Sequence, residues 1–165
     1  MAVHPIEERY GTKEMRAIWS EQNRFSAIVS AEVALAKAEA RCGMIPAAAA
    51  VEISEKATGA SLERAKAIEL EISHDMMAIV KAISEVTGES GRWVHYGATS
   101  NDILDTATAL QLRQALDLID AKLRTLLAVL LRRAEESKTL VCIGRTHGQH
   151  GVPTTFGLWF AIWAS

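Results

Sequence analysis

The spacing of apolar residues in the second half of the chain constrains its fold more than any other feature. These residues recur every three or four positions: Leu112, Leu116, Ile119, Leu123, Leu126, Leu130 and Ala134. A repeat near 3.5 residues places them on one face of a helix, which we predict to run from about 102 to 137. An apolar face of this kind is typical of a helix in a near-parallel bundle.

The first half of the chain is predicted to be helical as well. Apolar steps of three or four follow Thr12, a suitable helix cap, and predict one helix of about 30 residues that ends at Gly43. Shorter elements follow it: helices at 46–57, from Ser61 toward Ile72 and at 73–88, then a glycine-containing loop at 89–102.

The end of the chain predicts one more helix. Pro153 is expected to begin it, after a polar bend rich in glycine. The segment that follows, "TTFGLWFAIWAS", is apolar around most of its circumference, so we expect it to be buried between other helices. No strand is expected, and the predicted fold class is all-α.

Composition and charge exclude several classes of function. The 165 residues include 18 Lys and Arg against 20 Asp and Glu, and no basic cluster is interleaved with aromatics, so no nucleic-acid partner is expected. No apolar run reaches the ~18 residues of a membrane span, and the start of the sequence lacks the apolar core of a secretory signal. We therefore expect a cytoplasmic protein, in which Cys42 and Cys142 are reduced, buried thiols.

Histidines next to hydroxyls or carboxylates mark the candidate site. They form three clusters at predicted helix ends: Ser73-His74-Asp75, His95 with Thr99 and Ser100, and Thr146-His147 with His150. Helix N-termini present free N–H groups to anions, and hydroxyls add donors without net charge. Histidine can transfer protons near neutral pH. The clusters therefore suggest a helical enzyme that binds a small molecule with two or three negative groups, although the residues leave its reaction open.

Each cluster also has a plain structural interpretation. His74-Asp75 can be a helix-start pair, and Thr99-Ser100 can cap the long helix. Arg9 and Tyr10 can be surface residues or a guanidinium and a phenol for a phosphate.

A metal is not expected at the last cluster. His147 and His150 have an HxxH spacing, but no suitably spaced third ligand follows and no cysteine ligand is close in sequence. His4, beside Pro5, is expected to be solvated.

Four segments resemble adenylosuccinate lyases, a family of the fumarase/aspartase superfamily. In chain order they are "ERYGTKEMRAIWSEQNRF", "SHD", "WVHYGATSNDILDT" and "GRTHGQHGVPTTFG". The resemblance implies a small helical N-terminal domain at 1–98, followed at 99–165 by the beginning of the central bundle domain. It also implies a homotetramer without a cofactor, in which segments of three subunits form each active site.

The resemblance implies a role for each candidate residue. His147 matches the general acid, and His74 matches a histidine that assists proton transfer. The remaining matches are to substrate-binding residues: Arg9 and Tyr10 for the nucleotide, His95 for its phosphate, Ser73, His74 and Asp75 as one element, and Thr99, Ser100 and Thr146 as hydroxyls for a succinyl carboxylate. His150 is expected to orient the loop.

The implied reaction is β-elimination of fumarate from adenylosuccinate, giving AMP, and from a related succinylcarboxamide ribotide. Family chains continue well past this length and carry a serine loop, Ser-Ser-x-Met-Pro-x-Lys-x-Asn, whose serine is the base. That pattern does not occur here, so we expect an N-terminal fragment without lyase activity of its own. A cycloisomerase acting on 3-carboxy-cis,cis-muconate, or a non-catalytic helical assembly module, remains an alternative.

Overall fold

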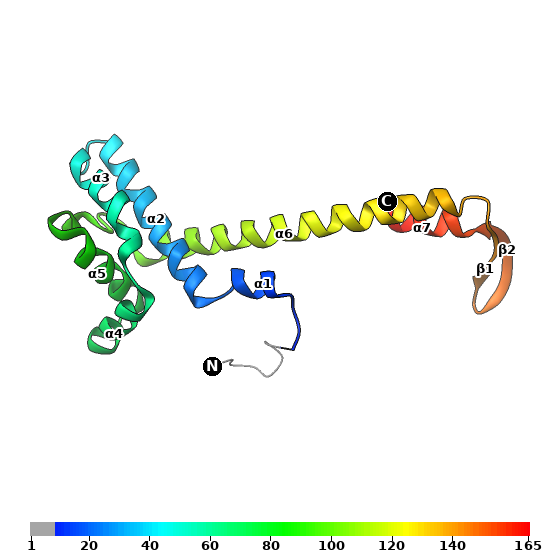
Figure 1. Ribbon diagram of the computed structural model, residues 1–165, viewed down its shortest axis with the longest axis horizontal. Helices are drawn as coiled ribbons and strands as arrows, with labels where there is room; N and C mark the ends of the chain where they lie inside the picture. The colour runs from blue at the N-terminus through cyan, green and yellow to red at the C-terminus, as the bar shows by residue number, and fades with distance from the viewer. Residues whose placement is uncertain (1–8) are drawn as a thin grey trace. The chain divides into compact units, whose positions relative to one another are not determined.

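The structure, a computed structural model, describes residues 9–165 (Figure 1). The chain divides into two compact units, Met1–Ala115 and Leu116–Ser165. The division falls inside one helix, α6 (Ser100–Glu136). His4 lies outside the described residues.

Helices make up the first unit. They are the first part of α6 together with α1 (Lys13–Ile18), α2 (Glu21–Arg41), α3 (Ala47–Lys56), α4 (Leu62–Ile72), α5 (Asp75–Thr87) and the short 3-10 helices η1 (Ala57–Gly59) and η2 (Gly88–Trp93). The predicted helices at 46–57, after Ser61 and at 73–88 are confirmed. Ser61 caps α4 as expected, because its side chain accepts a hydrogen bond from the Arg64 N–H.

The predicted helix of about 30 residues is wrong in one respect, because the chain breaks between α1 and α2. Thr12 caps α1, but Ser20 is extended (φ −69°, ψ 152°) and caps α2 by accepting a hydrogen bond from the Asn23 N–H. A second capping residue inside the apolar pattern therefore starts a new helix.

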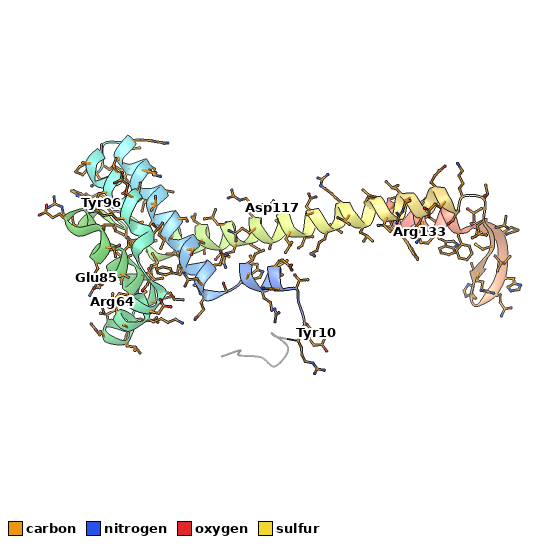
Figure 2. All side chains as sticks on the ribbon, viewed as in Figure 1. Tyr10, Arg64, Glu85, Tyr96, Asp117 and Arg133 are labelled. Atoms are coloured by element: carbon orange, nitrogen blue, oxygen red, sulfur yellow. The ribbon has the colours of Figure 1, made fainter. Side chains whose placement is uncertain are left out.

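The core of the first unit lies among α2, α3, α4 and α5. Its largest fully enclosed apolar side chains are Ile28, Ile53, Met76 and Ile83. Met76, Val80 and Ile83 form the inward face of α5, and all three are buried. On the outer side, Arg64 of α4 donates two hydrogen bonds to the Glu85 carboxylate of α5, at 2.7 and 2.6 Å (Figure 2).

The first part of α6 packs on this core by a face other than the periodic apolar one. Its buried residues are four apart: Ile103, Ala107, Gln111 and Ala115. The Gln111 side-chain amide donates to the Ile18 carbonyl at 2.7 Å, which joins α6 to the end of α1. The periodic apolar face that begins at Leu112 is exposed over most of its length, with Leu116 at 62% and Leu123 at 57%.

The second unit contains a β-hairpin where a helical bend was expected. Strands β1 (Val141–Thr146) and β2 (Gln149–Thr155) pair antiparallel, and Pro153 lies within β2 opposite Ile143. The prediction that Pro153 begins the last helix is therefore wrong. Helix α7 (Phe156–Ala164) begins after Thr155, whose hydroxyl accepts from the Leu158 N–H. The other regular elements among residues 9–165 are helices, as predicted.

Two further expectations about burial are wrong. Most of α7 is exposed, including Trp159 and Trp163, and only Gly157 is buried. Within its unit, α7 meets the end of α6 through that glycine, where an added Cβ would lie 2.6 Å from the Ala134 carbonyl oxygen. Cys42 is also exposed rather than buried, although both cysteines are free.

Candidate functional site

The Ser73-His74-Asp75 cluster forms the junction between α4 and α5. Ser73 adopts a left-handed conformation (φ 52°) that ends α4. His74 caps α5, because its Nδ1 accepts a hydrogen bond from the Met77 N–H at 3.2 Å. Nδ1 is therefore an acceptor in this arrangement, and the neutral ring carries its proton on Nε2. That nitrogen is the one available to a ligand.

Asp75 contributes to the edge of a mixed-charge cavity. Its carboxylate accepts from the Met76 N–H at 2.7 Å and lies 3.8 Å from the His74 ring. The cavity, of about 120 Å³, is also lined by Arg24 and Lys66. Glu21 and Glu69 line the cavity too, and Lys66 donates to Glu21, so the lining balances two cations against three carboxylates and does not by itself favour an anion.

His95 is held by a carboxylate that the sequence interpretation did not include. Its Nδ1 lies 2.6 Å from Glu32 Oε1, and its backbone N–H donates to Glu32 Oε2 at 3.1 Å. The Glu32 side chain is fully enclosed in α2. Burial raises the pKa of the Glu32 carboxyl, and the hydrogen bond and charge of His95 oppose that rise. The two residues are 63 positions apart, so spacing does not reveal the pair.

A signal for Glu32 was nevertheless present in the apolar pattern of α2. Glu32 and Glu39 are seven residues apart and lie on the face that also buries Phe25, Ile28 and Ala36. An acidic residue at such a position is rarely enclosed without a partner. Two acids on the buried face therefore mark a polar site in the core.

Thr99 and Ser100 stand at the start of α6. The Thr99 N–H donates to the Asp102 carboxylate at 2.9 Å, and the Asp102 N–H donates to the Thr99 carbonyl. The Asp102 carboxylate therefore supports the start of α6, and these bonds do not involve the Thr99 or Ser100 hydroxyl that was expected to cap it. Thr99 is exposed and Ser100 half-buried, so both are accessible to a ligand.

Thr146 and His147 lie at the tip of the hairpin in the second unit. The turn consists of His147 (φ 51°) and Gly148 (φ 72°), between the paired residues Thr146 and Gln149. Positive φ values at both central residues are those of a type I′ turn, which suits the twist of a hairpin. A histidine at the first central position is therefore displayed on a short, well-defined loop. His150, in β2, is exposed and pairs with Arg145.

The two nucleotide-binding candidates are exposed. Tyr10 (Figure 2) is 63% exposed. The Arg9 guanidinium lies 5.8 Å from the centre of the Tyr10 ring. A cation above an aromatic face is a weak local contact that leaves the guanidinium donors free for an anion.

The candidate residues do not share one cavity. Asp75 lines the cavity described above, whereas the loop before α6 lines another, of about 500 Å³, through Tyr96, Gly97 and Ala98. Thr146 and His147 belong to the second unit. Among residues 9–165, no group of three or more His, Cys, Asp or Glu side chains is placed to hold a metal ion.

A membrane-spanning helix is not found in the part of the chain that the structure describes. Each helix there is either too short or too polar to cross a bilayer.

Known proteins are similar to this chain over its whole length. The lyase family model matches residues 8–165. The adenylosuccinate lyase of Pyrococcus horikoshii is 54% identical over 165 residues, which cover 99% of this chain and 37% of that protein. The chain thus spans little more than a third of the length of the curated relatives it matches.

Two solved structures share the fold. A fumarate lyase from Mesorhizobium sp. BNC1 has a TM-score of 0.85 and 37% identity, over 94% of this chain and 38% of that one. The β-carboxy-cis,cis-muconate cycloisomerase of Acinetobacter calcoaceticus sp. ADP1 has a TM-score of 0.83 and 30% identity, over 98% of this chain and 39% of that one.

Proposed function

Because this chain belongs to the lyase family, we propose that it supplies part of the active site of an adenylosuccinate lyase. The observation that carries the proposal is the 54% identity to the Pyrococcus horikoshii enzyme over the whole chain, against 30% to the cycloisomerase. Because both matches cover nearly the whole chain, the higher identity makes the cycloisomerase alternative the less favoured one.

The proposed reaction is cleavage of a C–N bond by β-elimination. A base takes the proton from the succinyl carbon next to a carboxylate, and negative charge spreads into that carboxylate. The C–N bond then breaks, fumarate leaves, and an acid protonates the nitrogen of AMP. We assign the acid to His147 and a supporting proton-transfer role to His74, and we place the base outside residues 1–165.

The other candidate residues are proposed to hold the substrate. Hydroxyls of Thr99, Ser100 and Thr146 would donate to a succinyl carboxylate, and Ser73 with Asp75 would contact the substrate beside His74. Arg9, Tyr10 and His95 would bind the nucleotide part. The exposure of Arg9, Thr99 and His147 supports these roles, because each group is accessible to a ligand.

Self-association is part of the proposal. Apolar side chains of α6 and α7 are exposed from Leu116 to Trp163, and a surface of this kind is typical of a protein interface. We propose that a homotetramer of the complete enzyme covers it and brings the clusters together. The cytoplasmic location and the division into domains 1–98 and 99–165 belong to the same proposal.

A chimaera tests the function. Residues 1–165 would replace the matching segment of the Pyrococcus horikoshii enzyme, and release of fumarate from adenylosuccinate would be followed by absorbance. We expect an active chimaera, and no activity from the 165-residue chain alone. A folded chimaera that cleaves adenylosuccinate no faster than its His147→Gln variant would contradict the proposal. If the chimaera converted 3-carboxy-cis,cis-muconate instead, the cycloisomerase alternative would be favoured. If it had neither activity, the non-catalytic assembly module would be favoured.

A further inference from the structure

The contact between Glu32 and His95 fixes both the backbone and the ring of the histidine. One carboxylate oxygen accepts from the backbone N–H at 3.1 Å, and the other lies 2.6 Å from Nδ1. His95 has a positive φ of 64°, which is unfavourable for a residue with a side chain. A two-point contact with an enclosed carboxylate offsets that cost and leaves the ring little freedom to rotate.

The other ring nitrogen faces outward. Among the described residues, Nε2 of His95 has no hydrogen-bond partner. The only enclosed side-chain nitrogen or oxygen without a partner in residues 9–165 is Glu39 Oε2, so Nε2 is reachable from solvent. A ligand can therefore meet His95 only through this atom.

The number of protons on the Glu32–His95 pair determines whether Nε2 is a hydrogen-bond donor or an acceptor. When the pair is neutral overall, either Glu32 is protonated and donates to Nδ1, or Glu32 is ionised and Nδ1 donates to it. In both forms Nε2 carries a proton and is a donor. Only when the pair loses one more proton does Nε2 become an acceptor, and the pair then carries a negative charge. The titration belongs to the pair and not to one residue.

We propose that Glu32 is a positioning residue that fixes the His95 ring and links the binding of an anionic substrate group at Nε2 to one proton held by the Glu32–His95 pair. The inference rests on the proposed function for the identity of that group, a phosphate or a carboxylate. The anion binds to the form of the Glu32–His95 pair that is neutral overall, in which Nε2 carries a proton. Above the pH at which the pair loses that proton, the anion therefore binds together with one proton. An isolated surface histidine would lack this fixed orientation.

The surrounding charges favour retention of that proton. Glu39, on the same face of α2, adds negative charge beside Glu32. Asp102, at the start of α6, is exposed and is already bonded to the Thr99 N–H. Burial and acidic neighbours therefore favour the neutral form of the pair.

The first test needs no ligand. Nitrogen NMR of the 165-residue chain, labelled with ¹⁵N-histidine, reports which ring nitrogen of His95 is protonated. As pH rises, we expect Nε2 to lose its proton while Nδ1 keeps one. Loss of the proton from Nδ1 at high pH would overturn the proposal. Because this measurement uses the unaltered chain, it tests the proposal even if a variant does not fold.

Glu32→Gln gives the opposite pattern if the proposal is right. The amide oxygen must accept from the His95 backbone N–H, so the NH₂ group faces Nδ1 and makes it an acceptor. Nε2 then keeps its proton at all pH values above the neutral range. Glu39→Gln, a buried acid on the same helix, is the matched control: it removes a negative neighbour and should move the transition to lower pH, but Nε2 should still be the nitrogen that loses its proton. An unaltered pattern in folded Glu32→Gln would refute the positioning role.

The second test uses the active chimaera. Above the transition of the pair, KM for adenylosuccinate should rise about tenfold per pH unit, since one proton accompanies binding. In Glu32→Gln this rise should disappear while kcat stays within a few-fold. An equal slope in both proteins would contradict the proposal. If the chimaera is inactive, the proposed function fails, whereas the NMR result still decides the role of Glu32.

Discussion

Glu39 is an enclosed carboxylate whose ionisation should weaken the fold. It is 5% exposed, and its Oε2 has no hydrogen-bond partner among the described residues. Burial raises the pKa of this carboxyl most, the charge of Glu32 raises it further, and His95 opposes the shift. A raised pKa means that the folded chain binds more protons than the unfolded chain. Stability should therefore fall as pH rises above the ordinary pKa of a glutamate.

Replacing Glu39 with Gln should stabilise the first unit at neutral and higher pH. An enclosed polar atom without a partner costs about 1–3 kcal/mol. Gln removes the charge but keeps a polar group in place, so we expect the free energy of unfolding to rise by an amount near the lower limit, about 1 kcal/mol. For a chain of this size that corresponds to a rise in Tm of about 3 °C.

Thermal unfolding followed by circular dichroism at pH 4 and pH 8 measures this effect. The difference between Glu39→Gln and the unaltered chain should be small at pH 4, where the carboxyl is largely protonated, and reach its full size at pH 8. Glu55→Gln, an exposed acid on α3, should show no such dependence. A variant that is less stable than the unaltered chain at pH 8 would show that the Glu39 charge has a partner and refute the reasoning.

Three further predictions concern the core, the proposed acid and association. Ile83→Ala should lower the free energy of unfolding by about 2–5 kcal/mol in urea titrations, because Ile83 is fully enclosed, whereas Leu70→Ala, at an 88% exposed site, should have little effect. In the active chimaera, His147→Gln should reduce kcat by at least about 100-fold with an unchanged circular dichroism spectrum; an unchanged rate would remove His147 from the acid role. The 165-residue chain should elute from a sizing column as an associated species, because the apolar faces of α6 and α7 are exposed; a clean monomer would contradict this expectation.

Local sequence signals predicted most of the helices. A period of 3.5 to 3.6 residues located α5 and α6, and a capping serine located the start of α4. The same kind of signal at Ser20 was overlooked, and the apolar pattern was extended across the break between α1 and α2. The hairpin was missed because its glycines and Pro153 were assigned to a bend, although both strands contain β-branched residues, such as Ile143 and Val152.

The sequence identified the candidate residues, but it did not predict how they are arranged in space. Spacing along the chain identified His74 and His95 as residues at helix boundaries. It did not show that Nδ1 of His74 is occupied by a backbone N–H, or that His95 is held by Glu32. Contacts of this kind join residues that are far apart in the chain, and local periodicity carries no information about them.

By itself, the sequence determined where helices form and which residue types are available for chemistry, because period and capping depend on neighbours within a few positions. The tertiary structure decided which faces are buried. The core of the first unit selected the side of α6 with Ile103 and Ala107 and left the leucine-rich side exposed, although that side has the stronger apolar pattern. Burial depends on which surfaces meet, and the pairing of Glu32 with His95 exists only because the packing of the first unit encloses that carboxylate beside the loop that carries the histidine.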